Sequence, residues 1–411
     1  MNKWKTYKLG DLIDVKHGFA FKGEFFSDEP TEDILLTPGN FKIGGGFKTD
    51  KFKYYKGDYP KSYVLKEGDI LITMTDLSKA GDTLGYSAKI PKHNGINYLH
   101  NQRLGLVQFK SDDIDPDFLY WVLRTQPYQY YIVGSATGST VKHTSPTRIC
   151  SYEFSAPTDK GEQQQIAQIL SSLDDKIELL QQMNQTLENI AHAIFKEWFV
   201  DFNFPGFDGE LVDGLPKGWK KCIVKDFGKI VCGKTPSKAI DEYFGGEYMF
   251  IKIPDMHNTV FVTNTNDTLT DRGINSQPNK TLPAFSICVS SIATVGLVCI
   301  NPKPCQTNQQ INTIAPKDDF LKYYVYFLTL AMKETFVSTA SGGTATLNMN
   351  TSQFSNLSAI YPNNDILILF DEIVSPLMEK ILENQYQIQA LTQTRDILLP
   401  KLISGQLEIK N

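Results

Sequence analysis

The stretch "GKIVCGKT" at 228–235 fits the spacing of a phosphate-binding loop, G-x-x-x-x-G-K-[ST]. In such a loop, free backbone N–H groups and the lysine hold phosphate oxygens, and a helix starts at the lysine. Here Ile230 and Val231 favour a strand, and Pro236 biases Thr235 away from helical geometry. We therefore expect a strand followed by a turn at this stretch, and no nucleotide site.

Signatures of other chemistry are missing from the sequence. There is no G-x-S-x-G, H-E-x-x-H or G-x-G-x-x-G motif, and the six histidines are scattered. The six cysteines form no C-x-x-C pair and lack zinc-ligand spacing, so we expect reduced, mostly structural thiols. These observations favour binding over catalysis, with no metal and no cofactor bound by this chain.

Two polar loops, 134–148 and 341–353, carry side chains suited to DNA. Arginine and lysine suit guanine edges, asparagine and glutamine suit adenine edges, and hydroxyls suit phosphates. Different polar groups at equivalent positions would let a duplicated reader recognise two different half-sequences; the alternative is a pair of ordinary solvated loops. The candidate DNA-binding residues are Lys79, Arg103, Lys142, His143, Thr144, Arg148, Lys234, Thr235, Gln309, Gln310, Thr344, Asn348, Asn350 and Gln353.

The chain repeats itself. "WKTYKLGDLIDVKHG" from Trp4 resembles "WKKCIVKDFGKIVCG" from Trp219, and the Trp and the closing Gly are 14 positions apart in both. Further matches keep one order: "NQR" at 101–103 with "NQQ" at 308–310, "DFLYW" at 117–121 with "DFLKY" at 319–323, and "SATGST" at 135–140 with "TASGGT" at 339–344. Several matches in one order, with a slowly drifting offset, predict an internal duplication.

Each half ends with a segment of helical periodicity. Apolar residues recur in steps of three and four from Ile166 to Trp198 and from Phe370 to Leu402. Pro376 predicts a kink in the second segment, as does Pro400 near its end. Helices of roughly 35–40 residues are about 50–60 Å long, and the simplest arrangement packs them as an antiparallel pair that holds two globules apart. The alternative is a pair of ordinary core helices in one larger domain.

Length and composition fit this organisation. A chain of 411 residues with 41% hydrophobic and 21% charged residues predicts more than one globular domain. The net charge is −5, and most of the acidity lies in 161–205 and 366–411. No basic-then-apolar leader precedes the first domain, and the most apolar window, 286–300, is too short to span a bilayer and predicts buried strands. We expect a cytoplasmic protein without a membrane partner.

The expected fold class is mixed α/β (α+β). Two globular domains are separated by two long antiparallel coiled-coil helices, with an internal pseudo-twofold repeat. The expected boundaries are 1–160 for the first globule, 161–204 for the central helix, 205–365 for the second globule and 366–411 for the C-terminal helix.

Two long stretches carry a family resemblance: "EQQQIAQILSSLDDKIELLQQMNQTLENIAHAIFKEWFVDF" at 162–202 and "RDILLPKLISGQLEI" at 395–409. "GDILIT" at 68–73 and "GKTPS" at 233–237 fit the same family. Over essentially its whole length, the chain resembles the DNA-specificity subunit of type I restriction-modification systems.

The resemblance implies a non-catalytic subunit. Each globule would be a target-recognition domain that reads one half of a split, asymmetric sequence in double-stranded DNA, and the helices would fix the gap. Two methyltransferase subunits would dock on it and methylate adenine with S-adenosylmethionine, and motor-nuclease subunits would use ATP and Mg²⁺. The candidate docking anchors near the end of the first long helix are Phe195, Trp198, Phe199 and Phe202. Their alternative role is packing against the following domain.

Two rival functions stay open from the residues themselves. One is a coiled-coil scaffold with two protein-binding heads, which needs only the helices and the globules. The other is an enzyme that uses "GKIVCGKT" as a phosphate-binding loop.

Overall fold

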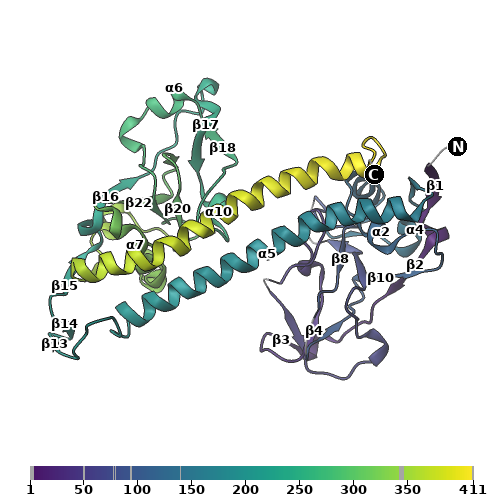
Figure 1. Ribbon diagram of the computed structural model, residues 1–411, viewed down its shortest axis with the longest axis horizontal. Helices are drawn as coiled ribbons and strands as arrows, with labels where there is room; N and C mark the ends of the chain where they lie inside the picture. The colour runs from purple at the N-terminus through teal and green to yellow at the C-terminus, as the bar shows by residue number, and fades with distance from the viewer. Residues whose placement is uncertain are drawn as a thin grey trace. The chain divides into compact units, whose positions relative to one another are not determined.

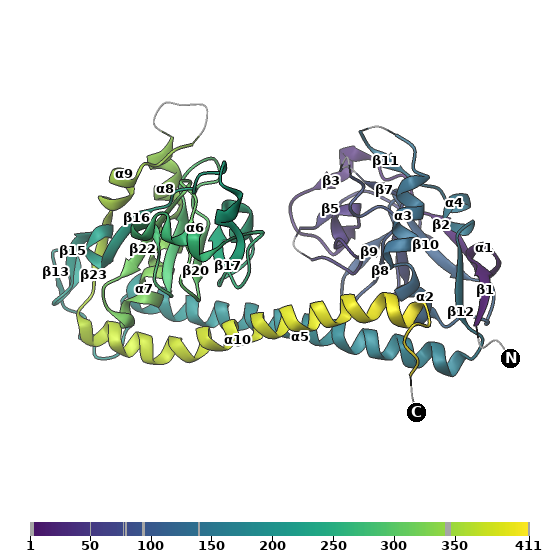
Figure 2. The same ribbon diagram turned by 90° about the horizontal axis from the view of Figure 1, so that it is seen from above.

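A computed structural model of the chain describes residues 4–49, 51–76, 78, 80–92, 95–138, 140–341 and 347–409. The chain divides into two compact units, of which unit 1 comprises 1–175 and 391–411 and unit 2 comprises 176–390. Both units are drawn in Figures 1 and 2.

Two helices of 40 residues each take part in both units: α5 (Lys160–Phe199) and α10 (Asn364–Ile403). The helix α5 begins in unit 1 and ends in unit 2, whereas α10 begins in unit 2 and ends in unit 1. The sequence predicts kinks or frayed ends at Pro376 and Pro400, but α10 is continuous through both prolines.

In unit 1, short helices surround several small sheets. The strands are β1 (Trp4–Lys8), β2 (Ile13–His17), β3 (Phe26–Ser27), β4 (Asp33–Leu35), β5 (Lys53–Tyr55), β6 (Ile70–Thr73), β7 (Thr75–Asp76), β8 (Ser87–Lys89), β9 (Asn97–Leu99), β10 (Leu104–Phe109), β11 (Lys142–His143) and β12 (Glu153–Pro157). The helices besides α5 and α10 are α1 (Leu9–Leu12), α2 (Pro116–Val122), α3 (Gln126–Gly134) and α4 (Pro146–Cys150).

The main sheet of unit 1 is antiparallel, with strand order β2-β10-β6-β8. Its core contains α2, whose Trp121 is fully buried and donates a hydrogen bond of 3.0 Å from Nε1 to Ser171 Oγ of α5. Ile166 and Leu170 of α5 and Leu402 of α10 join the same core. The apolar faces predicted for the two long helices therefore pack into the core of unit 1 at these ends.

In unit 2 the plan recurs. The strands are β13 (Leu211–Val212), β14 (Leu215–Pro216), β15 (Lys220–Ile223), β16 (Gly228–Cys232), β17 (Phe244–Ile251), β18 (Asp267–Leu269), β19 (Ser286–Ser290), β20 (Val298–Asn301), β21 (Gln306–Thr307), β22 (Ile311–Pro316) and β23 (Ser358–Tyr361). The helices besides α5 and α10 are α6 (Asp271–Asn275), α7 (Lys322–Ala331), α8 (Lys333–Ala340) and α9 (Thr351–Ser355).

The topology of the two units confirms the duplication. The main sheet of unit 2, with order β16-β22-β19-β20, repeats the antiparallel order of β2-β10-β6-β8. In each unit the strand at the repeated Trp pairs with the strand that precedes a long helix, β1 with β12 and β15 with β23. The mixed α/β class with two long helices is therefore confirmed.

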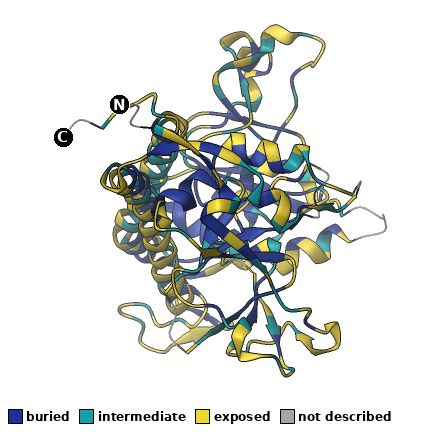
Figure 3. Ribbon diagram, turned by 90° about the vertical axis from the view of Figure 1, so that its right-hand side faces the viewer, coloured by how far each residue is buried: buried dark blue, intermediate teal, exposed yellow. Residues whose placement is uncertain are grey.

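The apolar window 286–300 forms the buried strands β19 and β20, as the sequence predicts. All six cysteines are free, and Cys288, Cys299 and Cys305 are fully buried. Burial raises the pKa of the Cys305 thiol well above its ordinary value. These thiols therefore pack as small apolar groups. Figure 3 shows buried positions alternating with exposed ones along the elements.

Candidate nucleic-acid interface

In unit 1, backbone hydrogen bonds join two of the segments that carry candidate residues. The N–H of Met74, which follows β6, donates to the carbonyl oxygen of Arg103 at 2.9 Å. The carbonyl oxygen of Met74 accepts a bond of 3.0 Å from the N–H of Thr144. Met74 thus links the turn before β10 to the segment after β11 through its backbone.

Unit 2 has the same frame at equivalent positions. The N–H of Ser291 donates to the carbonyl oxygen of Gln310 at 2.8 Å, and the carbonyl oxygen of Ser291 accepts from the N–H of Met349 at 2.9 Å. Ser291 therefore corresponds to Met74, and Gln310 corresponds to Arg103. The similarity of "NQR" and "NQQ" in the sequence reflects this shared geometry.

The equivalence continues into the helix that follows each frame. Ser145 is the N-cap of α4 and accepts from the N–H of Arg148, while Asn350 is the N-cap of α9 and accepts from the N–H of Gln353. This correspondence also pairs His143 with Asn348, because both lie two residues before an N-cap. Each unit thus presents a polar rim that consists of a turn, a short extended segment and a helix start.

The equivalent rim residues differ in chemical type. Unit 1 carries Arg103, His143 and Arg148, and all three side chains are exposed. Unit 2 carries Gln310, Asn348 and Gln353 at these positions; Asn348 and Gln353 are exposed and Gln310 is half-buried. The rim of unit 1 is therefore basic, whereas the rim of unit 2 consists of neutral amides.

Neighbouring groups restrain the rim of unit 1. His143 Nδ1 lies 3.1 Å from Thr75 Oγ1. Lys142 lies opposite Asp76 in the backbone pairing of β7 with β11. Burial raises the pKa of Asp76, but hydrogen bonds from Ser78 and Thr83 outweigh burial and hold this pKa below its usual value. Asp76 is therefore a structural carboxylate that stays ionised beside the rim.

Thr144 differs from the other candidates of unit 1. Its side chain is buried, and its hydroxyl has no hydrogen-bond partner within the described part of the chain. Thr144 thus contributes to the rim through its backbone hydrogen bond to Met74 and not through an exposed side chain.

Two candidates of unit 2 already hold the start of α9. Asn350 Oδ1 accepts from the N–H of Gln353 at 2.9 Å, and Gln353 Oε1 accepts from the N–H of Asn350 at 3.0 Å. This capping box occupies both side-chain oxygens. Gln353 keeps its exposed amide NH₂ as a donor, so its contribution to recognition would be a donated bond.

The stretch "GKIVCGKT" forms a strand, as expected, and not a phosphate-binding loop. Gly228–Cys232 is β16, which pairs with β22, and no helix starts at Lys234. Lys234 is exposed, and its N–H donates to the carbonyl oxygen of Thr307 at 2.9 Å. Thr235 Oγ1 donates to Gln309 Oε1 at 2.9 Å. The fold thus brings Lys234 and Thr235 next to the "NQQ" turn.

Two lysines beside this turn were not predicted from the sequence. Lys238 and Lys252 line a hollow of about 390 Å³ together with Thr235 and Gln309. No motif or repeat match marks them; Lys238 follows Thr235 by three residues, and Lys252 directly follows β17. Gln102, the equivalent of Gln309, was also missed, although the match of "NQR" with "NQQ" contained the signal. Of the predicted candidates, Lys79 and Thr344 lie outside the described residues.

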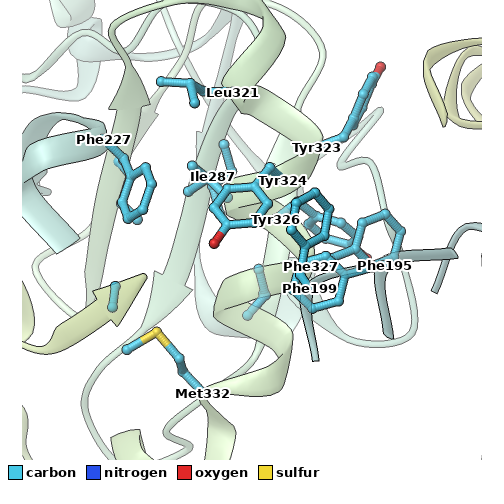
Figure 4. Close-up of a cluster of buried hydrophobic side chains, with 14 of the residues drawn as sticks. Phe195, Phe199, Phe227, Ile287, Leu321, Tyr323, Tyr324, Tyr326, Phe327 and Met332 are labelled. Atoms are coloured by element: carbon cyan, nitrogen blue, oxygen red, sulfur yellow. The ribbon is translucent and has the colours of Figure 1, made fainter. Parts of the chain in front are cut away.

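Phe195 and Phe199, two of the four aromatic residues predicted as docking anchors, lie in the core of unit 2 (Figure 4). Phe195, Trp198 and Phe199 are at most 8% exposed. The ring of Phe199 lies 4.7 Å from that of Tyr324, and the partly buried ring of Phe202 lies 5.4 Å from that of Trp219. The structure thus shows these rings packed inside their own unit, which is their alternative role, and their docking role stays a prediction.

Within the described ranges, no group of three or more His, Cys, Asp or Glu side chains is placed to hold a metal ion. Among the helices of the same residues, none is both long and apolar enough to cross a membrane.

Comparisons with known proteins place the chain among similar sequences and folds. A family model described as "Type I restriction modification DNA specificity domain" matches residues 1–189 and again 216–392. The "Type I restriction enzyme HindI specificity subunit" of Haemophilus influenzae is 36% identical, over 99% of this chain and 100% of that protein. The "Type I restriction enzyme MjaIX specificity subunit" of Methanocaldococcus jannaschii is 28% identical, over 73% of this chain and 71% of that protein.

A solved structure has a similar fold. The S subunit of a type I restriction-modification system from M. genitalium matches with a TM-score of 0.62 over 97% of this chain and 96% of that chain. The sequence identity is 14%, so this similarity concerns the fold alone.

Proposed function

The chain belongs to the type I restriction modification DNA specificity family, and we propose that its two units read the two halves of a bipartite, asymmetric DNA target. The chain is the specificity subunit of a restriction-modification complex. In this proposal it catalyses nothing itself and supplies the sequence information for partners that do.

One observation carries the proposal: the same backbone frame presents different side chains in the two units. Arg103 and Arg148 of unit 1 correspond to Gln310 and Gln353 of unit 2. Arginine pairs in a bidentate manner with guanine O6 and N7, whereas the free amide NH₂ of a glutamine can donate to adenine N7. Equal frames with unequal side chains are what a reader of two different half-sequences requires.

The remaining candidates suit phosphates and grooves more than base edges. Lys142 and Lys234 can neutralise phosphate charge, whereas the Thr235 hydroxyl already donates to Gln309 Oε1. The chain nevertheless has a net charge of −5. We therefore expect the isolated chain to bind DNA weakly, with partner subunits contributing most of the electrostatic attraction.

For the partners, we propose two methyltransferase subunits that use S-adenosylmethionine, and motor-nuclease subunits that use ATP and Mg²⁺. The acidic, glutamine-rich faces of α5 and α10 are the proposed docking surface, since the aromatic residues near the end of α5 are engaged in packing. The helices would also set the number of base pairs between the half-sites.

The test is methylation-sensitive sequencing of DNA from cells that carry the chain and its methyltransferase partner. We expect methylated adenines in two short half-sequences separated by a gap of fixed length. A single continuous motif, or no methylation that depends on this chain, would contradict the proposal.

A gel-shift experiment distinguishes a specificity subunit from a coiled-coil scaffold. It uses random duplexes, the chain and its partner subunit. A specificity subunit gives a shift that weakens as salt rises, because binding releases counterions from the duplex. A scaffold with two protein-binding heads gives no salt-dependent shift.

A further inference from the structure

The turn that carries Gln102 in unit 1 and Gln309 in unit 2 is the most closely duplicated part of the two rims. Asn101 Oδ1 accepts from the N–H of Arg103 at 3.1 Å, and Asn308 Oδ1 accepts from the N–H of Gln310 at 3.1 Å. Both asparagines are 8% exposed. Each thus acts as an internal brace that fixes the backbone of the glutamine next to it.

A glycine packs against each turn, directly after β2 in unit 1 and directly after β16 in unit 2. A Cβ atom on Gly18 would lie 2.1 Å from the carbonyl oxygen of Asn101, and one on Gly233 would lie 2.1 Å from that of Asn308. No side chain fits at either position, so close approach of the strand to the turn requires glycine. In each unit, the asparagine and the glycine together fix the backbone of the turn that carries the glutamine.

The glutamines themselves are identical and exposed. Gln309 is further oriented by Thr235, whose hydroxyl donates to its Oε1 and leaves the amide NH₂ as the free end. Every other rim position compared between the units differs in type, namely Arg103 with Gln310, His143 with Asn348, and Arg148 with Gln353. Among these exposed positions, only the glutamine is the same in both units.

We propose that Gln102 and Gln309 make equivalent contacts to the DNA phosphate backbone, one in each half-site. Two identical side chains on equivalent, equally braced turns fit a feature that both half-sites share whatever their sequences, and the backbone is that feature. Glutamine side chains are regular donors to phosphate oxygens. The glutamines would set the register of each unit on the duplex, while the differing residues read bases. The inference rests on the proposed function.

The experiment compares methylation by the complex of this chain with its methyltransferase partner, on a duplex that carries the target found by sequencing. Gln102→Ala and Gln309→Ala should each lower the methylation rate at limiting enzyme by about tenfold, since a hydrogen bond to a charged group is lost. The recognised sequence should stay unchanged in both. Gln108→Ala is the matched control, because Gln108 is an exposed glutamine on the adjoining strand β10, and it should keep the parent rate.

Glutamate substitutions separate a phosphate contact from base reading. Gln102→Glu places a negative charge against the backbone, so the rate should fall below that of Gln102→Ala with the motif intact. If the glutamine instead reads adenine, glutamate would favour cytosine, since it accepts from N4, and the motif would change.

A changed motif in any glutamine variant overturns the inference, and so does a parent rate in both alanine variants with unchanged melting temperatures. Neither outcome touches the proposed function, provided the parent methylates a bipartite target. If the parent shows no such target, the proposed function itself fails.

Discussion

Arg395 of α10 donates a hydrogen bond of 2.5 Å from Nη1 to Oδ1 of Asp174 in α5. The other carboxylate oxygen of Asp174 accepts a bond of 2.6 Å from Nη1 of Arg124, whose side chain is 3% exposed. Arg124 also donates to the carbonyl oxygen of Gly44 and to the hydroxyl of Tyr120. In unit 1, one carboxylate thus ties α10 and the end of α2 to α5.

Asp174→Ala should lower the free energy of unfolding by about 3 kcal/mol, because it leaves the buried guanidinium of Arg124 without its counter-charge. Urea denaturation followed by circular dichroism measures this loss. Asp175→Ala is the control, since the neighbouring carboxylate is exposed and should change stability by less than about 0.5 kcal/mol. Equal losses in the two variants would show that the ion pairs of Asp174 contribute nothing.

Arg148→Gln gives unit 1 the residue that unit 2 carries at the equivalent position. We expect one base-pair position of one half-sequence to relax or change, by roughly 5- to 150-fold in preference. The other half-sequence should stay the same, because the altered side chain belongs to one unit. Methylation-sensitive sequencing gives both halves at once.

Asn348→Ala changes the rim of unit 2 instead and should alter only the half-sequence that Arg148→Gln leaves intact. Changes in both halves from a single substitution would mean that the rims do not read separately.

Shortening α5 and α10 together should shorten the gap in the target. Asn384 Nδ2 donates to Asn184 Oδ1 at 2.8 Å, so the segments 179–185 and 383–389, which contain these residues, lie opposite each other. Removing both takes seven residues from each helix, or about 10 Å of its length, which is about three base pairs. Seven residues are close to two full turns, so the apolar faces stay aligned.

Sequencing of methylated DNA should find both half-sequences unchanged with a gap about three base pairs shorter. Changed half-sequences with the parent gap would show that the helices do not measure the spacing. Deleting 179–185 alone breaks the pairing of the two helices and should abolish methylation.

Phe199→Ala should destabilise the chain by about 3–5 kcal/mol, because it leaves a cavity among packed rings. Phe199 lies 5.0 Å from Phe370 and 4.7 Å from Tyr324, measured between ring centroids. Val200→Ala, at a 54% exposed neighbour, should cost less than about 0.5 kcal/mol. Thermal denaturation compares the variants. If Phe199→Ala keeps the parent stability but no longer binds the methyltransferase, Phe199 is a docking residue.

Mild acid should lower the stability of unit 1, because the buried His100 becomes protonated on unfolding. Burial lowers the pKa of His100 to about 4, while its Nε2 lies 2.9 Å from the carbonyl oxygen of Leu104. The folded pKa is thus below the ordinary value of about 6.5, so the unfolded chain binds the proton more tightly. Stability is complete above pH 6.5 and falls as the pH drops from 6.5 to 4, by up to about 3 kcal/mol.

The comparison is His100→Thr, which introduces the residue found at the equivalent position, Thr307. Urea denaturation at pH 7 and pH 4.5 should show a smaller loss of stability in this variant than in the parent. The same pH dependence in both chains would assign the effect to other groups.

Several features of this protein follow from the sequence alone because they depend on neighbours along the chain. Helical periodicity determined α5 and α10, and the apolar window 286–300 determined β19 and β20. The repeat matches also located the two rims, including the correspondence of "NQR" with "NQQ". A duplicated fold keeps its short motifs in order, so equivalent positions can be found without coordinates.

The tertiary structure decided what each rim side chain is free to do. Phe195 and Phe199 are buried because Tyr324 and Phe370, more than 120 positions away in the sequence, pack on them. The oxygens of Asn350 and Gln353 are occupied because the chain starts a helix there. Burial and hydrogen-bond occupancy are sums over contacts from distant segments, and no local pattern encodes them. The periodicity thus predicted where the helices and strands lie in the sequence. Long-range contacts determined which side chains stay exposed and free to contact DNA.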